Sequence, residues 1–317
     1  MQNQIIINQI TILGLLALIG YITAKFKFFP EGFSLGLNKL VIKITLPLMI
    51  FTSLSKFDFS MEVLESSLFV LIFAYVSMFL LLFVATISAK IMKLESHAYT
   101  IHRIHTTFGN IAFLGYPLLD SLFPGGKGLL FAVVYHIVLS SMLWTVGVML
   151  FNKNKKIKLT ESLKHLINPN TIAFSLGILA FLVKFKLPYI LDKTLSGLGG
   201  TTLYLSMIYI GMMLSRISIK GTIKELQIYV LSINKMIIAP FILLYVIKFA
   251  EYLFGFEMDI TAKSVVVLQS AMPCMAMIVI IATEFKSDPE LAAKNVFLTT
   301  LLSAVTLPVV YWFIGWV

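Results

Sequence analysis

The sequence has little cysteine, few charged residues and none of the common catalytic motifs. Its 317 residues include one cysteine, Cys274, which excludes an internal disulfide and any metal site built from several cysteines. Asp, Glu, Lys and Arg together account for only 13% of the chain. The motifs H-E-x-x-H and G-x-S-x-G, the phosphate-binding loop and paired carboxylates inside apolar segments are all missing. We therefore expect no catalytic residue, no metal site and no cofactor, and the sequence argues against an enzyme or an ATP-driven pump.

Long apolar runs fill the sequence from end to end. Hydrophobic residues make up 59% of the chain, and the mean hydropathy is +0.94. The runs are continuous rather than alternating, so they predict membrane-spanning helices and argue against a β-barrel. Ten spans are expected, at about residues 5–24, 34–54, 64–89, 104–122, 128–151, 170–187, 197–214, 227–250, 263–284 and 291–315. The expected fold class is an all-α, multi-pass membrane protein.

Basic residues in the loops indicate the orientation of the chain. If the N-terminus lies outside, fifteen Lys and Arg residues fall in cytoplasmic loops and six in external loops, as the positive-inside rule requires. The net charge of +10 therefore reflects topology, and we expect no nucleic-acid partner. The first run begins near Ile5 without a basic region or a cleavage site, so it reads as a retained helix. We expect a cell-membrane protein with both termini outside.

A weak internal repeat divides the chain into halves. The two Lys-Phe-Lys triplets begin at Lys25 and Lys184, 159 residues apart (184 minus 25), and Pro117 and Pro273 lie 156 apart (273 minus 117). Because each copy has five helices, an odd number, the second would enter the membrane from the opposite side. Such inverted repeats are typical of secondary transporters. The expected organisation is a first repeat at 1–151, a basic cytoplasmic linker at 152–169 and a second repeat at 170–317.

Two expected spans, the fourth and the ninth, carry interruptions. They contain "GNIAFLGYPLLD" (109–120) and "LQSAMPCMAM" (268–277). Proline removes a backbone donor, and a freed backbone group is tolerated in a membrane only where protein or a wet cavity surrounds it. One reading is two simple kinks; the matched positions favour a binding site, where half-helix N-termini would attract an anion. The candidate substrate-binding residues are Asn110, Gly115, Pro117, Pro47, Gln269, Ser270 and Pro273.

These stretches resemble a known family. "FGNIAFLGYPL", "LQSAMPCMAMIVIIATEFKSDPELAAKNVFLTTLLSAVTLP", "LNKLVIKITLPLMIFTSL" and "LGGTTLYLSMIYIGMML" are similar to the auxin efflux carriers, which include bacterial malate-permease-like proteins. The resemblance implies ten helices in an inverted repeat, related to bile acid and sodium/proton transporters. It implies a scaffold domain and a transport domain, each drawing helices from both repeats, with the broken fourth and ninth helices crossing at Pro117 and Pro273 beside Asn110. Tyr204 stands where the family often has proline.

A few other polar residues lie inside the apolar spans. His136, in the fifth span, is a candidate proton-coupling group, or a neutral histidine bonded to a neighbour. Asp120 could bind a coupling ion or lie solvated at the mouth of the site. Lys43 could pair with a substrate carboxylate or extend to the cytoplasm, and Lys235 is expected to extend to the cytoplasm. His97, His102 and His105 do not have the spacing of a metal site.

The function expected from these features is secondary transport of small organic anions by alternating access. Malate-like dicarboxylates are favoured by the resemblance alone. An exporter of auxin-like monocarboxylates or amino acids is the first alternative, and a membrane sensor that keeps the fold without transport is the second. Coupling to H⁺ or Na⁺ is left open, and the resemblance is compatible with a homodimer.

Overall fold

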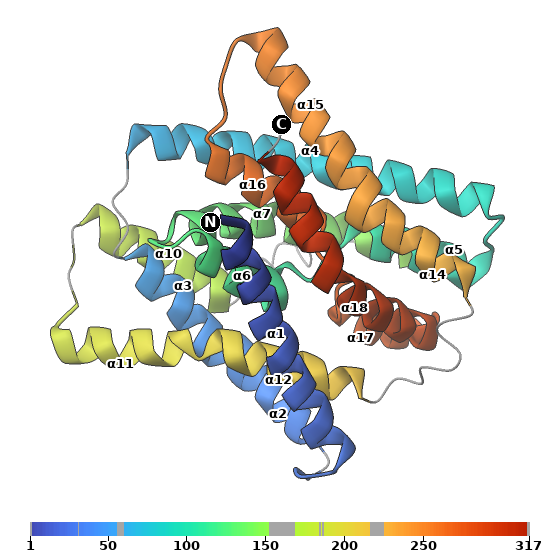
Figure 1. Ribbon diagram of the computed structural model, residues 1–317, viewed down its shortest axis with the longest axis horizontal. Helices are drawn as coiled ribbons and strands as arrows, with labels where there is room; N and C mark the ends of the chain where they lie inside the picture. Colours follow the sequence, from blue (N-terminus) through green and yellow to red (C-terminus); the bar gives the residue numbers. More distant parts are fainter. Residues whose placement is uncertain are drawn as a thin grey trace. The chain divides into compact units, whose positions relative to one another are not determined.

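The computed structural model describes residues 2–30, 32–55, 60–151, 169–183, 185, 187–215 and 225–315. Within these residues it is helical, with a single isolated β-bridge. The helices (Figure 1) are α1 (Gln2–Lys25), α2 (Phe33–Leu40), α3 (Leu46–Leu54), α4 (Met61–Ile91), α5 (Ser96–Thr107), α6 (Tyr116–Leu122), α7 (Lys127–Met142), α8 (Val148–Phe151), α10 (Pro169–Leu182), α11 (Tyr189–Gly200), α12 (Thr202–Leu214), α14 (Leu226–Ile233), α15 (Ala239–Phe254), α16 (Ile260–Ser270), α17 (Met277–Glu284) and α18 (Pro289–Ile314). Four π-helical turns join some of them: η1 (Val41–Thr45), η2 (Ile111–Gly115), η3 (Leu143–Gly147) and η4 (Asn234–Ile238).

The helices confirm a multi-pass membrane protein. Six helical stretches are long and apolar enough to cross a membrane: Phe33–Leu54, Met61–Ile91, Lys127–Phe151, Tyr189–Leu214, Leu226–Phe254 and Pro289–Ile314. Shorter apolar helices cover Thr11–Lys25, Ile111–Leu122 and Pro169–Ala180, in the first, fourth and sixth expected spans. The ninth expected span is divided into α16 and α17. The count of ten spans remains a prediction, as do the repeat boundaries, and nearly all of the 152–169 linker lies outside the described residues.

Three π-helical turns share one cause. Pro47, Pro117 and Pro240 each follow the last residue of a π-turn by two positions, after η1, η2 and η4. Proline has no backbone N–H and its ring clashes with the preceding turn, so an ordinary helical turn cannot form there. A wider turn accommodates the proline, and the Leu46 N–H accordingly bonds the carbonyl five residues back, at Val41. These prolines therefore leave their helices continuous.

The chain forms two compact units. The first consists of Met1–Glu65, Ala112–Val133 and Leu166–Arg216, and the second of Ser66–Ile111, Val134–His165 and Ile217–Val317. Each unit thus draws segments from both halves of the sequence.

Helix α1 packs closely on α12 in the first unit, as Figure 1 shows. A Cβ atom at Gly20 would overlap the Ile208 carbonyl oxygen, and one at Gly211 would overlap that of Ala17. Only glycine can occupy these positions, because any side chain would overlap the facing backbone. Small residues of this kind allow close helix contact in membranes, where lipid provides no hydrophobic force between helices.

A second glycine contact in the first unit joins α10 to α3. A Cβ atom at Gly177 would lie 3.0 Å from the Leu54 Cβ and 3.4 Å from the Phe51 carbonyl oxygen. Gly177 follows Gly20 by 157 residues (177 minus 20), and Ile208 follows Phe51 by the same 157 (208 minus 51). The two glycine contacts therefore share one spacing along the sequence.

The second unit is held by an apolar cluster and by ion pairs. Buried side chains of α5, α14, α17 and α18 pack together at one end, with Ile101, Ile228 and Ala282 fully enclosed. Lys294 on α18 pairs with Glu225, just before α14, at 2.8 Å. Partial burial alone would raise the pKa of the Glu225 carboxyl, but hydrogen bonds from Lys294 and Gln227 outweigh burial and hold this pKa below its usual value.

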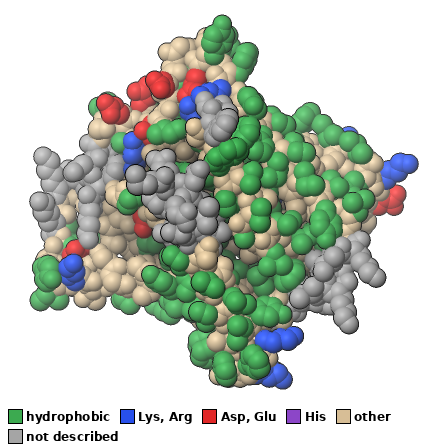
Figure 2. All heavy atoms as spheres, viewed as in Figure 1, with side chains coloured by type: hydrophobic (Ala, Val, Ile, Leu, Met, Phe, Trp, Pro, Cys, Tyr) green, Lys and Arg blue, Asp and Glu red, His purple; other side chains and the backbone are tan. Residues whose placement is uncertain are grey.

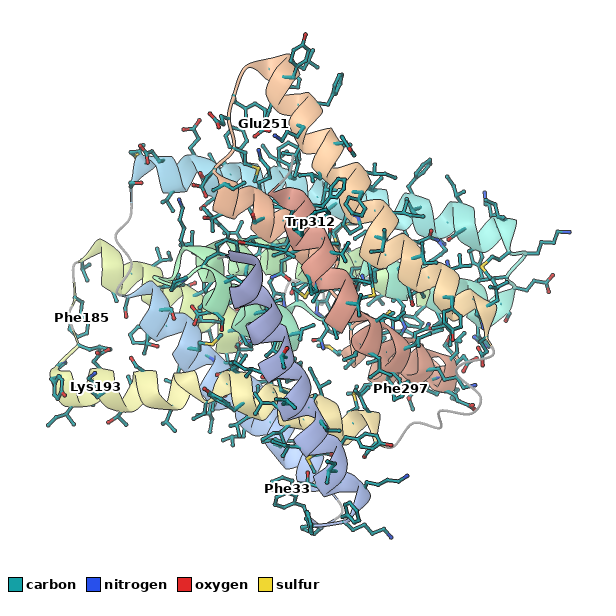
Figure 3. The ribbon with its side chains drawn as sticks, viewed as in Figure 1. Phe33, Phe185, Lys193, Glu251, Phe297 and Trp312 are labelled. Carbon is teal, nitrogen blue, oxygen red and sulfur yellow. The ribbon has the colours of Figure 1, made fainter. Side chains whose placement is uncertain are left out.

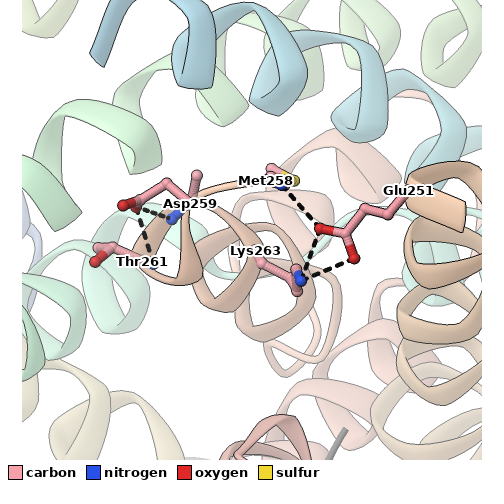
Figure 4. A network of polar contacts seen from close by, with 6 residues as sticks. Glu251, Met258, Asp259, Thr261 and Lys263 are labelled. Carbon is pink, nitrogen blue, oxygen red and sulfur yellow. Dashed lines mark hydrogen bonds and ion pairs between the residues drawn. The ribbon is translucent and has the colours of Figure 1, made fainter. Parts of the chain in front are cut away.

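A buried ion pair closes the connection from α15 to α16 (Figure 4). Glu251 lies near the C-terminal end of α15 (Figure 3), and its carboxylate is 2.8 Å from the Lys263 Nζ on α16. The same carboxylate accepts a 2.8 Å hydrogen bond from the Met258 N–H. Asp259 caps α16 by accepting bonds from the Thr261 and Ala262 amides. The loop thereby fixes the start of α16, the helix that leads to the candidate site.

Large hydrophobic side chains are exposed along the outer faces of the helices. On α15, Tyr245, Phe249 and Leu253 are all exposed, and Figure 2 shows hydrophobic side chains along this helix. Charged side chains on the same face gather mainly toward helix ends and loops. Exposed apolar surface along the full length of helices is what contact with lipid requires.

Candidate functional site

Two helix ends meet in the second unit and pair through their backbones. Helix α5 ends at Thr107, and Phe108 is extended. Gly109 and Cys274 form an antiparallel bridge, flanked by a 2.7 Å bond from the Asn110 N–H to the Pro273 carbonyl and a 3.3 Å bond from the Met275 N–H to the Phe108 carbonyl. We call residues 108–110 and 273–275 the crossing. It satisfies backbone groups that interrupted helices would otherwise leave unpaired in a membrane.

Local residue types explain why the crossing forms at these positions. Pro273 has no N–H to continue α16, which ends at Ser270. At Gly109, a Cβ atom would lie 3.1 Å from the Met272 Cβ and 3.2 Å from its carbonyl oxygen. Glycine therefore allows the two backbones to approach to hydrogen-bonding distance.

The crossing differs from the expected meeting of Pro117 with Pro273. Pro273 lies at the crossing, but its partner is Asn110. Pro117 lies in the first turn of α6, within a stretch that is helical from Ile111 to Leu122, because η2 accommodates the ring. Gly115 and Pro117 belong to the first unit, whereas Asn110 belongs to the second. In the fourth span, Pro117 marks a π-turn, whereas Gly109 marks the break.

Lys235, expected to extend toward the cytoplasm, is instead fully buried in the second unit. Its side chain has 0% exposure, and its Nζ donates a 3.0 Å hydrogen bond to the Thr106 carbonyl in the last turn of α5. The Nζ would lie 3.5 Å from a Cβ at Gly109, so the ammonium group stands beside the crossing. The sequence signal was a lysine within an apolar run shortly before a helical proline, and that pattern does not separate a buried lysine from an extended one.

Several buried polar side chains in the helices of the second unit lack protein partners. Both amide atoms of Gln269, 1% exposed on α16, and both ring nitrogens of His105, 0% exposed on α5, have no hydrogen-bond partner among the described residues. The Oδ1 of Asn295 on α18 is likewise unpaired in the described part of the chain. A buried unpaired polar group costs about 1–3 kcal/mol. Buried groups of this kind are normally satisfied by ordered water or by a ligand.

The two candidates closest to the breaks differ in what their side chains offer. Asn110 is 4% exposed, and its carboxamide carries two N–H donors. Ser270 is also buried, but its hydroxyl donates a 2.6 Å bond to the Val267 carbonyl within its own helix. Of these two side chains, that of Asn110 has the capacity to donate hydrogen bonds to a ligand.

The remaining candidates belong to other helical segments. Pro47 is half-buried and Lys43 exposed, both in the first unit near η1. Asp120 is half-buried on α6 in the first unit. His136 is half-buried on α7 in the second unit, next to Tyr135, whose hydroxyl lies 3.0 Å from the Ser77 Oγ. No group of three or more His, Cys, Asp or Glu residues that could hold a metal ion occurs among the described residues.

Comparison with known sequences identifies the family of the chain. The profile of the membrane transport protein family, the auxin efflux carriers, matches residues 5–311. The chain belongs to this family. Its resemblance to auxin efflux carriers, inferred from short motifs, is thereby confirmed over nearly the whole length.

Similar proteins come from archaea and from an animal. An uncharacterized transporter of Methanocaldococcus jannaschii is 27% identical over 96% of this chain and 97% of its own length. Another, from Methanothermobacter thermautotrophicus, is 27% identical over 92% of this chain and 93% of its own. The lysosomal cholesterol signaling protein of Mus musculus is 21% identical over 94% of this chain but only 36% of its own length.

Proposed function

We propose that this membrane transporter is a secondary carrier for small organic anions and that its substrate binds at the crossing. The observation that carries this proposal is the buried, unpaired amide of Gln269 on α16, the helix that leads to the crossing, together with the buried side chain of Asn110 at the crossing itself. Amide N–H groups are suitable donors to a carboxylate, and the Lys235 ammonium beside the crossing adds positive charge.

Alternating access is the mechanism that fits a site of this kind. In secondary transporters, broken helices meet near the membrane midplane, and one body moves against another around them. The division of the chain into two compact units supplies two such bodies.

An inverted repeat is supported by spacings within each unit. In the first unit, glycine contacts repeat at 157 residues. In the second, α4 and α14 begin 165 residues apart (226 minus 61), and Gly109 and Cys274 also lie 165 apart (274 minus 109). On this proposal the repeat has a different spacing in each unit. That difference explains why Pro117, which lies 156 residues before Pro273, is not its partner at the crossing.

Malate-like dicarboxylates are the favoured substrates within this proposal, on the family resemblance. Auxin-like monocarboxylates and amino acids are the alternatives within transport. A sensor without transport is the second candidate function, and the similarity to the mouse signaling protein is the observation in its favour. Counterflow separates the two: a carrier exchanges labelled malate across a proteoliposome membrane, whereas a sensor binds ligand without flux.

Substitution of Asn110 by leucine tests the binding site. The backbone bond from Asn110 to Pro273 does not need the side chain, so Asn110→Leu should leave the crossing folded. A hydrogen bond to a charged group contributes about 1.5–3 kcal/mol, and each 1.4 kcal/mol is a factor of about ten. The affinity for malate, or for the best substrate of an organic-acid panel, should therefore fall roughly ten-fold to a hundred-fold.

The control for this experiment is Asn38→Leu, on α2 in the first unit. Both variants are purified, checked for a single species and compared with the parent by scintillation proximity binding. Unchanged affinity in Asn110→Leu across the panel would move the binding site away from the crossing.

A further inference from the structure

Lys235 carries a charge where none is expected, in the interior of a membrane protein. It lies in η4, the π-turn that accommodates Pro240. Its side chain is completely buried. Lys263 pairs with Glu251, and Lys294 with Glu225 and Glu290, whereas Lys235 forms no ion pair with a carboxylate of the described residues. A buried charge without a partner costs several kcal/mol, so something other than a carboxylate must stabilise this one.

The carbonyl end of α5 provides that stabilisation. The last four carbonyls of a helix have no partner within the helix, and the C-terminus carries a partial negative charge. The Lys235 Nζ donates to one of these carbonyls, that of Thr106, at 3.0 Å. The neighbouring carbonyls of His105 and Phe108 face the Cys274 Sγ at 3.6 Å and the Met275 N–H at 3.3 Å. Helix α5 thus ends in a set of carbonyls that the second unit itself satisfies.

Carbonyls at the ends of broken helices are also the groups with which many secondary transporters bind Na⁺. Here an ammonium group already occupies such an end, 3.5 Å from where a Cβ of Gly109 would lie. Gly109 has no side chain, and this leaves room for the ammonium beside the crossing. A second monovalent cation at the same carbonyls would meet direct repulsion from the first.

We propose that the Lys235 ammonium is a resident cation of the crossing, which takes the place of Na⁺ at the carbonyl end of α5. The substrate site is then positively charged by the chain itself, and neither its folding nor its ligand binding requires Na⁺. This assignment rests on the proposed carrier function only where it concerns which ion is coupled to transport. The cation site itself can be tested without any substrate.

The test is thermal unfolding of the purified protein in NaCl and in choline chloride at equal concentrations. A cation that binds only the folded state raises the unfolding temperature, and the rise grows with the ratio of its concentration to its dissociation constant. The parent protein should therefore unfold at the same temperature in both salts. In Lys235→Gln the charge is lost, the side chain is shorter, and its carbonyl oxygen can itself ligate Na⁺. This variant should unfold at a lower temperature than the parent and regain stability in NaCl but not in choline chloride.

Lys90→Gln is the matched control, because Lys90 is an exposed lysine in the last turn of α4, in the same unit. It should behave like the parent in both salts. If Lys235→Gln does not fold, Lys235→Arg takes its place, and it should unfold at the same temperature in both salts because the charge is kept.

Two results would overturn the assignment. Stabilisation of the parent by Na⁺ over choline would show a free cation site, and indifference of Lys235→Gln to Na⁺ would show that no such site lies beneath Lys235. Both results are independent of whether malate is transported. A failure of the organic-anion proposal is seen in the binding panel and leaves this measurement unaffected.

Discussion

Neutralising Glu251 is expected to destabilise the second unit strongly. The carboxylate lies 2.8 and 2.9 Å from the Lys263 Nζ and also accepts the Met258 N–H at 2.8 Å. The two charged side chains are only 8% and 11% exposed, so water cannot replace either partner. Removing one member of a buried ion pair costs about 3–5 kcal/mol, because the other charge stays buried and unpaired.

The measurement is the unfolding temperature of purified protein in detergent at a fixed scan rate. For a body of 150–250 residues, 1 kcal/mol corresponds to about 2–4 °C, so Glu251→Gln should lower the unfolding temperature by roughly 6–20 °C. The double variant Glu251→Gln with Lys263→Met should lose less than the sum of its single variants, because it leaves no unpaired charge.

Glu290→Gln provides the comparison for an exposed ion pair. Glu290 also pairs with a lysine, Lys294, at 3.0 Å, but its side chain is 79% exposed. Exposed pairs contribute about 0.2–1 kcal/mol, so this variant should differ little from the parent. Equal behaviour of Glu251→Gln and Glu290→Gln would refute the argument that burial gives the pair on α15 and α16 its importance.

Three further predictions concern packing, coupling and topology. Gly20→Ala should destabilise the first unit by several kcal/mol in thermal unfolding, since its Cβ would overlap a facing backbone. The control, Gly14→Ala, should be neutral or slightly stabilising, because nothing lies within 4 Å of a Cβ at that position. Equal loss of stability in both variants would exclude the overlap as the cause. His136→Gln should bind substrate normally but lose the pH dependence of uptake, and an unchanged pH profile would leave His136 a structural role. Cysteines placed at Asn3 and at Lys155, in a variant without the native cysteine, should react with an impermeant label from opposite sides of the membrane. Reaction of both from one side would contradict five helices per half.

The class of the protein follows from its sequence because the signal is local. A membrane span needs only a sufficient run of apolar residues, and loops reveal themselves by their charge. The position of the break after α16 was also predictable, since Pro273 lacks a backbone N–H whichever segment packs against it. The π-turns before Pro47, Pro117 and Pro240 follow the same local chemistry, although a proline alone does not tell a widened turn from a broken helix.

Only the tertiary structure decided which segment pairs with the break at Pro273 and which charged side chain lies beside it. Gly109 and Cys274 are 165 residues apart, and nothing in either neighbourhood specifies their pairing before the helices of the second unit pack together. Lys235 presents the same difficulty. A lysine in an apolar run reads alike whether it extends to the membrane surface or turns inward, because the choice depends on a distant carbonyl, that of Thr106, at the end of another helix. The length of an apolar run is a property of one segment, whereas the stabilisation of a buried charge requires a partner on a second segment.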